Sequence, residues 1–140
     1  MTLRDVLLPL FVEVILTFVL LFWTAFLRTS AITGGAIATR DIALREPNWP
    51  AYCTQLANAF HNQLELPLLF YVLTILAWDT HHAGTIFVAL AWVFVILRVI
   101  QAVIHVTDNH VRRRGLAFIL GAIVLAIMWG IYMLDIFVGI

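Results

Sequence analysis

Four long apolar stretches occupy most of this 140-residue chain, at about residues 7–27, 52–78, 85–106 and 116–138. Each reaches the roughly 20 residues that a helix needs to cross a lipid bilayer. The composition agrees, because 64% of the residues are hydrophobic and only 11% are charged, whereas soluble domains carry about a quarter charged residues. The sequence therefore predicts an all-α membrane protein, a four-transmembrane-helix bundle that forms a single domain over residues 1–140.

The arginines are distributed unevenly among the connecting segments. Segments 28–51 and 107–115 together hold six of the eight basic residues, which are Arg28, Arg40, Arg45, Arg112, Arg113 and Arg114. The turn between the second and third stretches holds none, and only Arg4 precedes the first. Because basic segments stay on the cytoplasmic side of a membrane, we expect both segments in the cytoplasm and both termini outside. The expected location is a bacterial inner membrane.

Other features of the sequence exclude several classes of site. The formal net charge is zero, and no basic tail or aromatic–basic patch indicates a nucleic-acid partner. Cys53 is the single cysteine, so an intrachain disulfide and a cysteine-rich metal site are both excluded. His81 and His82 adjoin Asp79 in a short turn, where a solvated turn is the simpler interpretation than a metal site. We therefore predict no bound metal.

Polar residues recur at helical spacing on the second and third stretches. On the second they are Gln55, Asn58, Asn62 and Glu65, and on the third they are Arg98, Gln101, His105 and either Asp108 or Asn109. Steps of three and four residues place side chains on one face of a helix. Each helix is therefore expected to carry one polar face and to be apolar elsewhere.

The two polar faces are expected to match in depth, because the two helices form a hairpin. Glu65 lies thirteen residues before Trp78, and Arg98 lies thirteen after Thr85, so both sit about 20 Å from the outer end. The other matching levels are Asn62 with Gln101, Asn58 with His105, and Gln55 with Asp108. An unpaired charge at this depth costs roughly 2.5–3.5 kcal/mol. We therefore predict a Glu65–Arg98 ion pair, within one subunit or across a subunit interface.

Two facing polar surfaces permit two interpretations. They could be packing contacts between helices, for which one or two polar residues usually suffice. They could instead line a cavity that is open towards the cytoplasmic arginines and binds a polar ligand or an ion. The number of polar residues favours the cavity.

Two acidic residues lie outside these faces. Glu13 is on the first stretch, about seven residues from its outer end, and Asp135 is near the outer end of the fourth. Neither belongs to a polar face. We expect each to reach the membrane surface or to make one hydrogen bond to another helix.

The polar residues carry a family resemblance. The sequence NQLELP, with Asn62, Glu65 and Pro67, is followed by Arg98, Gln101, His105 and Arg112 at fixed spacing. This pattern resembles the MAPEG superfamily, the membrane-associated proteins in eicosanoid and glutathione metabolism. The resemblance extends over nearly the whole chain. It implies a homotrimer of four-helix subunits that binds glutathione between neighbouring subunits, in the cytoplasmic half of the membrane.

The resemblance also implies roles for individual residues. Asn62, Glu65 and Arg98 match residues that contact glutathione in the family, and Arg28 matches a further arginine at the end of the first helix. Gln101, His105, Asn58 and Gln55 complete the expected glutathione-binding set. Arg112 matches the catalytic arginine that stabilises the glutathione thiolate, the nucleophile of the reaction. A lipophilic small molecule, arriving from the membrane lipids, would be the second substrate.

Three functions follow as alternatives. The first is a glutathione-dependent transferase or peroxidase that acts on lipophilic substrates. The second is a non-catalytic lipid-binding or scaffold protein that has lost glutathione chemistry. Asn58 and His105 favour it. Active members have arginine at the position of Asn58, and they have tyrosines where this chain has Gln101 and His105. The third is a proton or ion pathway through Glu65, Arg98 and His105, against which the third stretch is apolar from Thr85 to Arg98.

Overall fold

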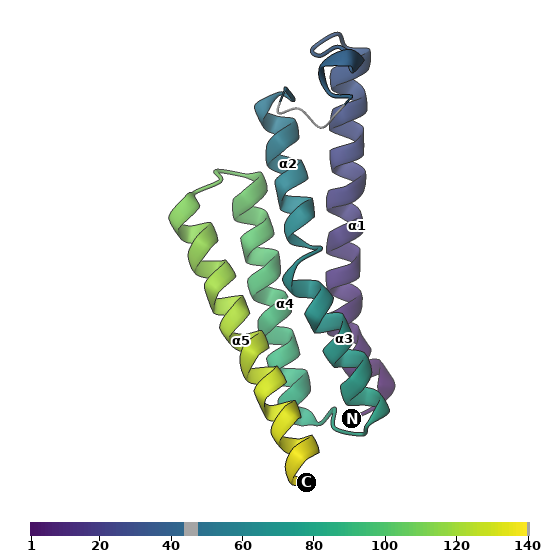
Figure 1. Cartoon of the computed structure of the whole chain (residues 1–140), viewed down its shortest axis with the longest axis vertical. Helices are drawn as coiled ribbons and strands as arrows, with labels where there is room; N and C mark the ends of the chain where they lie inside the picture. Colours follow the sequence, from purple (N-terminus) through teal and green to yellow (C-terminus); the bar gives the residue numbers. More distant parts are fainter. Residues whose placement is uncertain (44–47, 140) are drawn as a thin grey trace.

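The computed structural model describes residues 1–43 and 48–139. All regular secondary structure in this part of the chain is helical. The helices are α1 (Leu3–Thr33), α2 (Ala51–Asn62), α3 (Leu66–Asp79), α4 (Thr85–Val106) and α5 (Val111–Val138), with a short 3₁₀ turn, η1 (Thr39–Asp41) (Figure 1). Arg45, one of the arginines used to predict orientation, lies outside the described residues. The predicted all-α fold is confirmed.

Local sequence signals explain where α1 begins and where α5 ends. Thr2 caps α1: its hydroxyl accepts a hydrogen bond from the Asp5 amide, and the Asp5 carboxylate accepts one from the Thr2 amide. This reciprocal arrangement satisfies amides that have no partner within the helix. α5 ends at Gly139, whose positive φ of 74° is a conformation that glycine adopts at little cost.

The second predicted span is broken into two helices. α2 ends at Asn62 and α3 begins at Leu66, so that residues 63–65 leave the helical path. Pro67 explains the break, because proline lacks an amide hydrogen and its ring clashes with the carbonyl of the residue four positions earlier, here Gln63. The interruption therefore lies just before Pro67, and Figure 1 shows it between α2 and α3.

The helices form an elongated bundle in which α4 is central (Figure 1). It packs against α5, α1 and α2, while α1 also lies against α2 and α3. Both termini lie at one end of the bundle, together with the α3–α4 turn; we call this the terminal end. Segments 34–43, 48–50 and 107–110 lie at the other, which we call the basic end because Arg28, Arg40 and Arg112–Arg114 lie in or near them.

The interior and the surface of the bundle are both apolar. Phe70 of α3 and Phe94 of α4 are fully buried, with ring centroids 4.9 Å apart. Large apolar side chains such as Phe11, Phe22 and Phe137 are exposed on the outer faces. A soluble monomer rarely exposes apolar patches of this extent. Within the described residues, four helical segments are long and apolar enough to cross a membrane, so the protein is an integral membrane protein.

Candidate functional site

The break between α2 and α3 supplies a hydrogen-bond acceptor inside the bundle. In a continuous helix the Asn62 carbonyl would accept from the amide of residue 66, but α2 ends at Asn62 and the carbonyls of a last helical turn lack such partners. A guanidinium nitrogen of Arg98 on α4 donates to the Asn62 oxygen at 2.7 Å. The proline-induced break thus gives a buried arginine a partner.

Arg98 itself is completely enclosed. Its side chain is 0% exposed. Its second terminal nitrogen donates to the side-chain oxygen of Gln101, one turn further along α4, at 2.5 Å. Both terminal nitrogens of the guanidinium therefore donate hydrogen bonds to acceptors within the protein.

The predicted Glu65–Arg98 pair does not form within the chain. Glu65 is exposed, and no ion pair to Arg98 is present within residues 1–43 and 48–139. The reason is the break: the prediction continued the α2 helix to residue 65, whereas Glu65 stands in the interruption as the residue before α3. The intersubunit form of this pair stays a prediction.

The polar faces of α2 and α4 meet, but with a shift of about one turn. The side-chain amide of Asn62 lies 3.2 Å from Nδ1 of His105, whereas Gln101 was its expected partner. The side chain of Gln55 donates to the backbone oxygens of His105 and Thr107, at 2.8 and 3.1 Å. Non-helical residues rise more than the 1.5 Å per residue of a helix, so the interrupted second span moves Asn62 towards the basic end.

A pocket of about 440 Å³ opens where α2, α4 and α5 converge. Its lining joins Asn58, His61, Asn62 and Glu65 from the second span, Gln101 and His105 from α4, and Arg114, Gly115 and Phe118 from α5. Five of these were predicted site residues: Asn58, Asn62, Glu65, Gln101 and His105. The pocket presents amides, imidazoles, a carboxylate and a guanidinium, groups that together suit a polar ligand carrying both signs of charge.

Arg114 is the arginine that faces this pocket. A guanidinium nitrogen donates to the Asn109 side chain at 2.6 Å and lies 3.4 Å from Nε2 of His105. Arg112 is exposed and does not line the pocket. Arg112 lies seven residues after His105, a helical spacing, but residues 107–110 between them are not helical. Because of this non-helical turn, the helical spacing of α4 does not predict which residues of α5 face the pocket.

Two further predicted residues lie away from the pocket. Gln55 binds carbonyls at the end of α4, which is a helix-capping contact. The Arg28 guanidinium stacks over the ring of Trp49, at 4.9 Å from its centroid. Arg28 also borders a small cavity of about 120 Å³ between α1 and α2, whose lining shares His61 with the main pocket.

Sequence reasoning missed the role of Glu13. This residue is 0% exposed, and neither of its carboxylate oxygens accepts a hydrogen bond from the described residues. The expectation that Glu13 reaches the membrane surface or makes an interhelical hydrogen bond is therefore wrong for this part of the chain. Glu13 lies on α1, which packs against α4, the helix that carries the equally buried Arg98. No spacing rule within one helix could indicate that both charged side chains are buried.

Sequence reasoning also missed four residues that line the pocket, which are His61, Arg114, Gly115 and Phe118. His61 immediately precedes Asn62, and a broader search of the polar run Asn58–Glu65 could have included it. Arg114 belongs to the predicted cytoplasmic arginines. Phe118 carried no signal, because it is one of many aromatic residues on apolar helices.

Comparison with known proteins gives one match. The model of the MAPEG family matches residues 6–134, a range that contains most or all of each helix α1–α5 and every residue of the pocket. No curated protein and no solved structure matches the chain.

Proposed function

This chain belongs to the MAPEG family, and from that premise we propose that it binds glutathione in the pocket between α2, α4 and α5. The proposed activity is that of a glutathione-dependent transferase or peroxidase acting on lipophilic substrates. The observation that carries the proposal is the pocket itself, in which Asn58, Asn62, Glu65, His105 and Arg114 surround one space.

The chemistry of these residues matches that of the proposed ligand. Glutathione carries an ammonium group, two carboxylates, two peptide bonds and a thiol. Glu65 can pair with the ammonium group and Arg114 with a carboxylate or with the thiolate. Asn58 and Asn62 can exchange hydrogen bonds with the peptide groups. The volume of about 440 Å³ is within the range of pockets that hold small molecules.

The proposed reaction requires a thiolate. A cation beside the sulfur favours the thiolate over the thiol, and only the thiolate is a good nucleophile. Arg114 is the cation of this pocket within a single chain. In the transferase reaction the sulfur attacks an electrophilic carbon, a C–S bond forms, and the leaving group departs with its electron pair. In the peroxidase reaction two glutathione molecules become the disulfide while one hydroperoxide becomes an alcohol and water.

A homotrimer is part of this proposal. Arg28 borders a different cavity from the main pocket of its own chain, yet the family resemblance gives it a glutathione contact. A neighbouring subunit could bring Arg28, and also Arg112, to the pocket, because a closed ring repeats the same interface around its axis.

A second candidate function is non-catalytic lipid binding. The observation that favours it concerns Arg98, which the resemblance makes a glutathione contact. In this structure Arg98 is fully buried and donates to Gln101 and to the Asn62 carbonyl. In this arrangement it stabilises the break between α2 and α3 and does not face a ligand.

Glutathione titration of the purified protein in detergent separates the two functions. If glutathione binds, the unfolding temperature rises with its concentration, because a ligand specific to the folded state stabilises it. An analogue with a methyl group in place of the thiol should stabilise the protein too, while only glutathione should give the thiolate absorbance. Absence of both signals at millimolar glutathione would overturn the proposal.

Matched arginine variants then test the pocket. Arg114→Leu should reduce the thiolate signal, because it removes the cation beside the ligand. Arg113→Leu is the control, since Arg113 is exposed on the same helical turn and does not line the pocket. An equal loss of the thiolate signal in both variants would indicate a general effect of surface charge. Copurified lipid, together with no response to glutathione, would favour the second function.

A further inference from the structure

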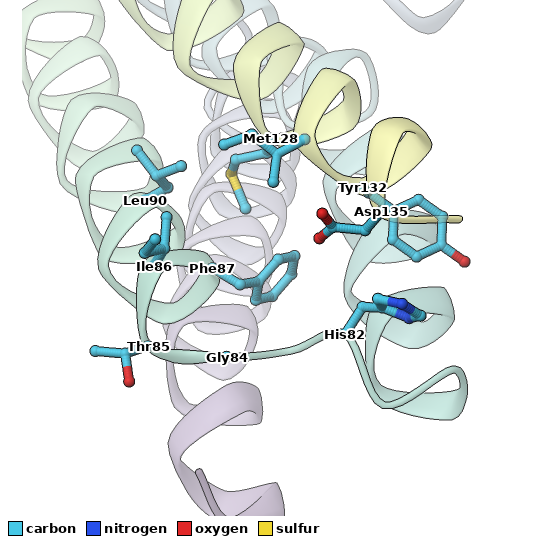
Figure 2. Close-up of a pocket in the computed structure, with 10 residues that line it drawn as sticks. His82, Gly84, Thr85, Ile86, Phe87, Leu90, Met128, Tyr132 and Asp135 are labelled. Carbon is cyan, nitrogen blue, oxygen red and sulfur yellow. The ribbon is translucent and has the colours of Figure 1, made fainter. Parts of the chain in front are cut away.

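A second cavity, of about 400 Å³, lies at the terminal end of the bundle, between the start of α4 and the last turns of α5 (Figure 2). It shares no lining residue with the proposed glutathione pocket. Its volume falls within the range of small-molecule sites. This cavity is not explained by the proposed function.

The walls of this cavity are mainly apolar. Phe87 and Leu90 contribute from α4, and Met128 contributes from α5 (Figure 2). Ile131 of α5 lines the cavity as well. Phe87 and Met128 are buried and belong to the hydrophobic core, whereas Ile131 is exposed on the outer face. A hydrocarbon group could therefore enter from the lipid and lie against the core.

One carboxylate projects into this apolar space. Figure 2 shows the side chain of Asp135 directed from α5 towards Phe87 and Leu90, while the hydroxyl of Tyr132 points away. The Tyr132 hydroxyl accepts a hydrogen bond from Thr80 at 3.4 Å. Within residues 1–43 and 48–139, the Asp135 carboxylate has no ion pair and no hydrogen bond. A charge beside apolar walls gains strongly from an ionic partner.

The charges around the cavity favour a cation as that partner. Asp5, Asp79 and Asp135 lie at the terminal end, and Arg4 is the only arginine in their vicinity along the described chain. His82 also lines the cavity, but its ring packs edge-on against Tyr132 and contacts the Thr80 hydroxyl at 3.1 Å. An anion would meet the Asp135 carboxylate without a guanidinium or ammonium to offset it.

We propose that this cavity binds an amphiphilic cation. Its protonated amine pairs with Asp135, and its hydrocarbon body lies against Phe87, Leu90 and Met128. The ligand chemistry, a primary ammonium on an aliphatic body, could come from a free lipophilic amine or from the headgroup of an amine-bearing phospholipid. The site lies at the end of the bundle, where such a molecule meets both water and lipid.

Three probes of equal chain length test this proposal on the purified protein in an uncharged maltoside detergent. They are octylamine, octanol and octanoate, which differ in head-group charge and share the same tail. Octylamine should stabilise the protein against thermal unfolding at a concentration about tenfold or more below that of octanol, since charge-assisted hydrogen bonds contribute about 1.5–3 kcal/mol. Octanoate should have the weakest effect. Equal effects of all three probes would overturn the proposal.

Variants then assign the preference to Asp135. Asp135→Asn keeps the size of the side chain and should abolish the preference for octylamine over octanol. Asp79→Asn is the matched control, because Asp79 is an exposed carboxylate at the same end that does not line the cavity. If Asp135→Asn retains the preference, or Asp79→Asn removes it, the proposal is wrong.

Two further measurements complete the test. Leu90→Trp fills the cavity and should weaken the binding of octylamine and of octanol alike. If this variant does not fold, Ile131→Trp is used instead, because Ile131 is exposed. Unchanged binding in the folded variant would place the ligand elsewhere. Added phosphatidylethanolamine distinguishes the sources: competition with octylamine assigns the site to a lipid headgroup, and absence of competition assigns it to a free amine.

Discussion

At the scale of single residues, the most constrained side chain is Arg98. It is fully buried in the middle of a membrane-spanning helix, where an uncompensated charge is costly. Two contacts reduce that cost: the side-chain oxygen of Gln101 and the carbonyl that the helix break exposes at Asn62. Glu13 on α1 is the fully buried carboxylate among the described residues, so we expect it to balance the charge of Arg98, whereas Glu65, which the sequence suggested, is exposed.

Arg98→Leu should lower the stability of the protein by about 3–5 kcal/mol, because removing one member of a buried charged set leaves the others uncompensated. Glu13→Gln in the Arg98→Leu background should restore part of that loss, since the unpaired carboxylate then disappears. Thermal or denaturant unfolding of the two single variants and the double variant gives the coupling energy.

Glu65→Gln provides the control for this cycle. If it rescues Arg98→Leu and Glu13→Gln does not, then Glu65, from the same or a neighbouring subunit, is the counter-ion. That result would restore the pairing predicted from the sequence and contradict the assignment to Glu13.

At the scale of helices, α2 combines two tasks on one polar face. Gln55 binds the carbonyls at the end of α4, whereas Asn58, one turn later, is exposed and lines the pocket. The same spacing pattern thus contains a residue for stability and a residue for binding. Only the packing of α2 on α4 distinguishes them.

Gln55→Leu should lower stability by about 1–3 kcal/mol, because it leaves the His105 and Thr107 carbonyls without their donor. Asn58→Leu should leave stability nearly unchanged and weaken the binding of glutathione. Thermal unfolding and glutathione titration on both variants measure the two effects. Equal losses of stability in the two variants would contradict this separation of roles.

The turn between α4 and α5 controls which arginine faces the pocket. Asn109 adopts a positive φ of 51° and accepts a hydrogen bond from Arg114. Asparagine tolerates this conformation better than most residues other than glycine. The geometry of four residues, 107–110, therefore determines that Arg114 lines the pocket and that Arg112 does not.

Asn109→Ala should lower both stability and the thiolate signal, because alanine disfavours the positive φ and cannot accept from Arg114. Asn109→Gly keeps the backbone conformation and removes only the side-chain acceptor. It should therefore preserve stability better than alanine while losing as much thiolate signal. If glycine restores the signal, the contact to Arg114 has no role in positioning it.

At the scale of the whole molecule, the even number of crossings brings both termini to one end of the bundle (Figure 1). The two ends differ in basic residues, since Arg28, Arg40 and Arg112–Arg114 lie in or near the basic end and Arg4 lies at the terminal end. The positive-inside rule therefore predicts a cytoplasmic basic end. This orientation also places the proposed glutathione pocket towards the cytoplasm and the proposed amine site towards the outside.

Cysteine labelling in cells tests the orientation. Thr2→Cys and Thr39→Cys each introduce an exposed thiol at opposite ends, in a background where the buried Cys53 is replaced by alanine. A membrane-impermeant maleimide should label position 2 in intact spheroplasts and position 39 only after lysis. Labelling of position 39 before lysis would reverse the orientation.

Mixed subunits test whether neighbouring chains share the pocket. Arg28→Leu and Glu65→Gln should each weaken glutathione binding in a trimer of identical variants. If Arg28 reaches the pocket of a neighbour, some interfaces in a mixed trimer combine an intact Arg28 with an intact Glu65, and binding should partly recover. No recovery in confirmed mixed trimers would mean that each pocket is completed within its own chain.

The sequence by itself determined the membrane class, the number of apolar spans and several polar residues of the pocket, because these depend on local hydrophobicity and on spacing within single helices. The tertiary structure decided which residues are partners, including Asn62 with His105, Arg98 with the Asn62 carbonyl, and Arg114 at the pocket where Arg112 was expected. The physical reason is that two short non-helical segments, 63–65 and 107–110, shift and rotate one helix relative to the next. The spacing of residues within one helix carries no information about how that helix is shifted and rotated relative to the next.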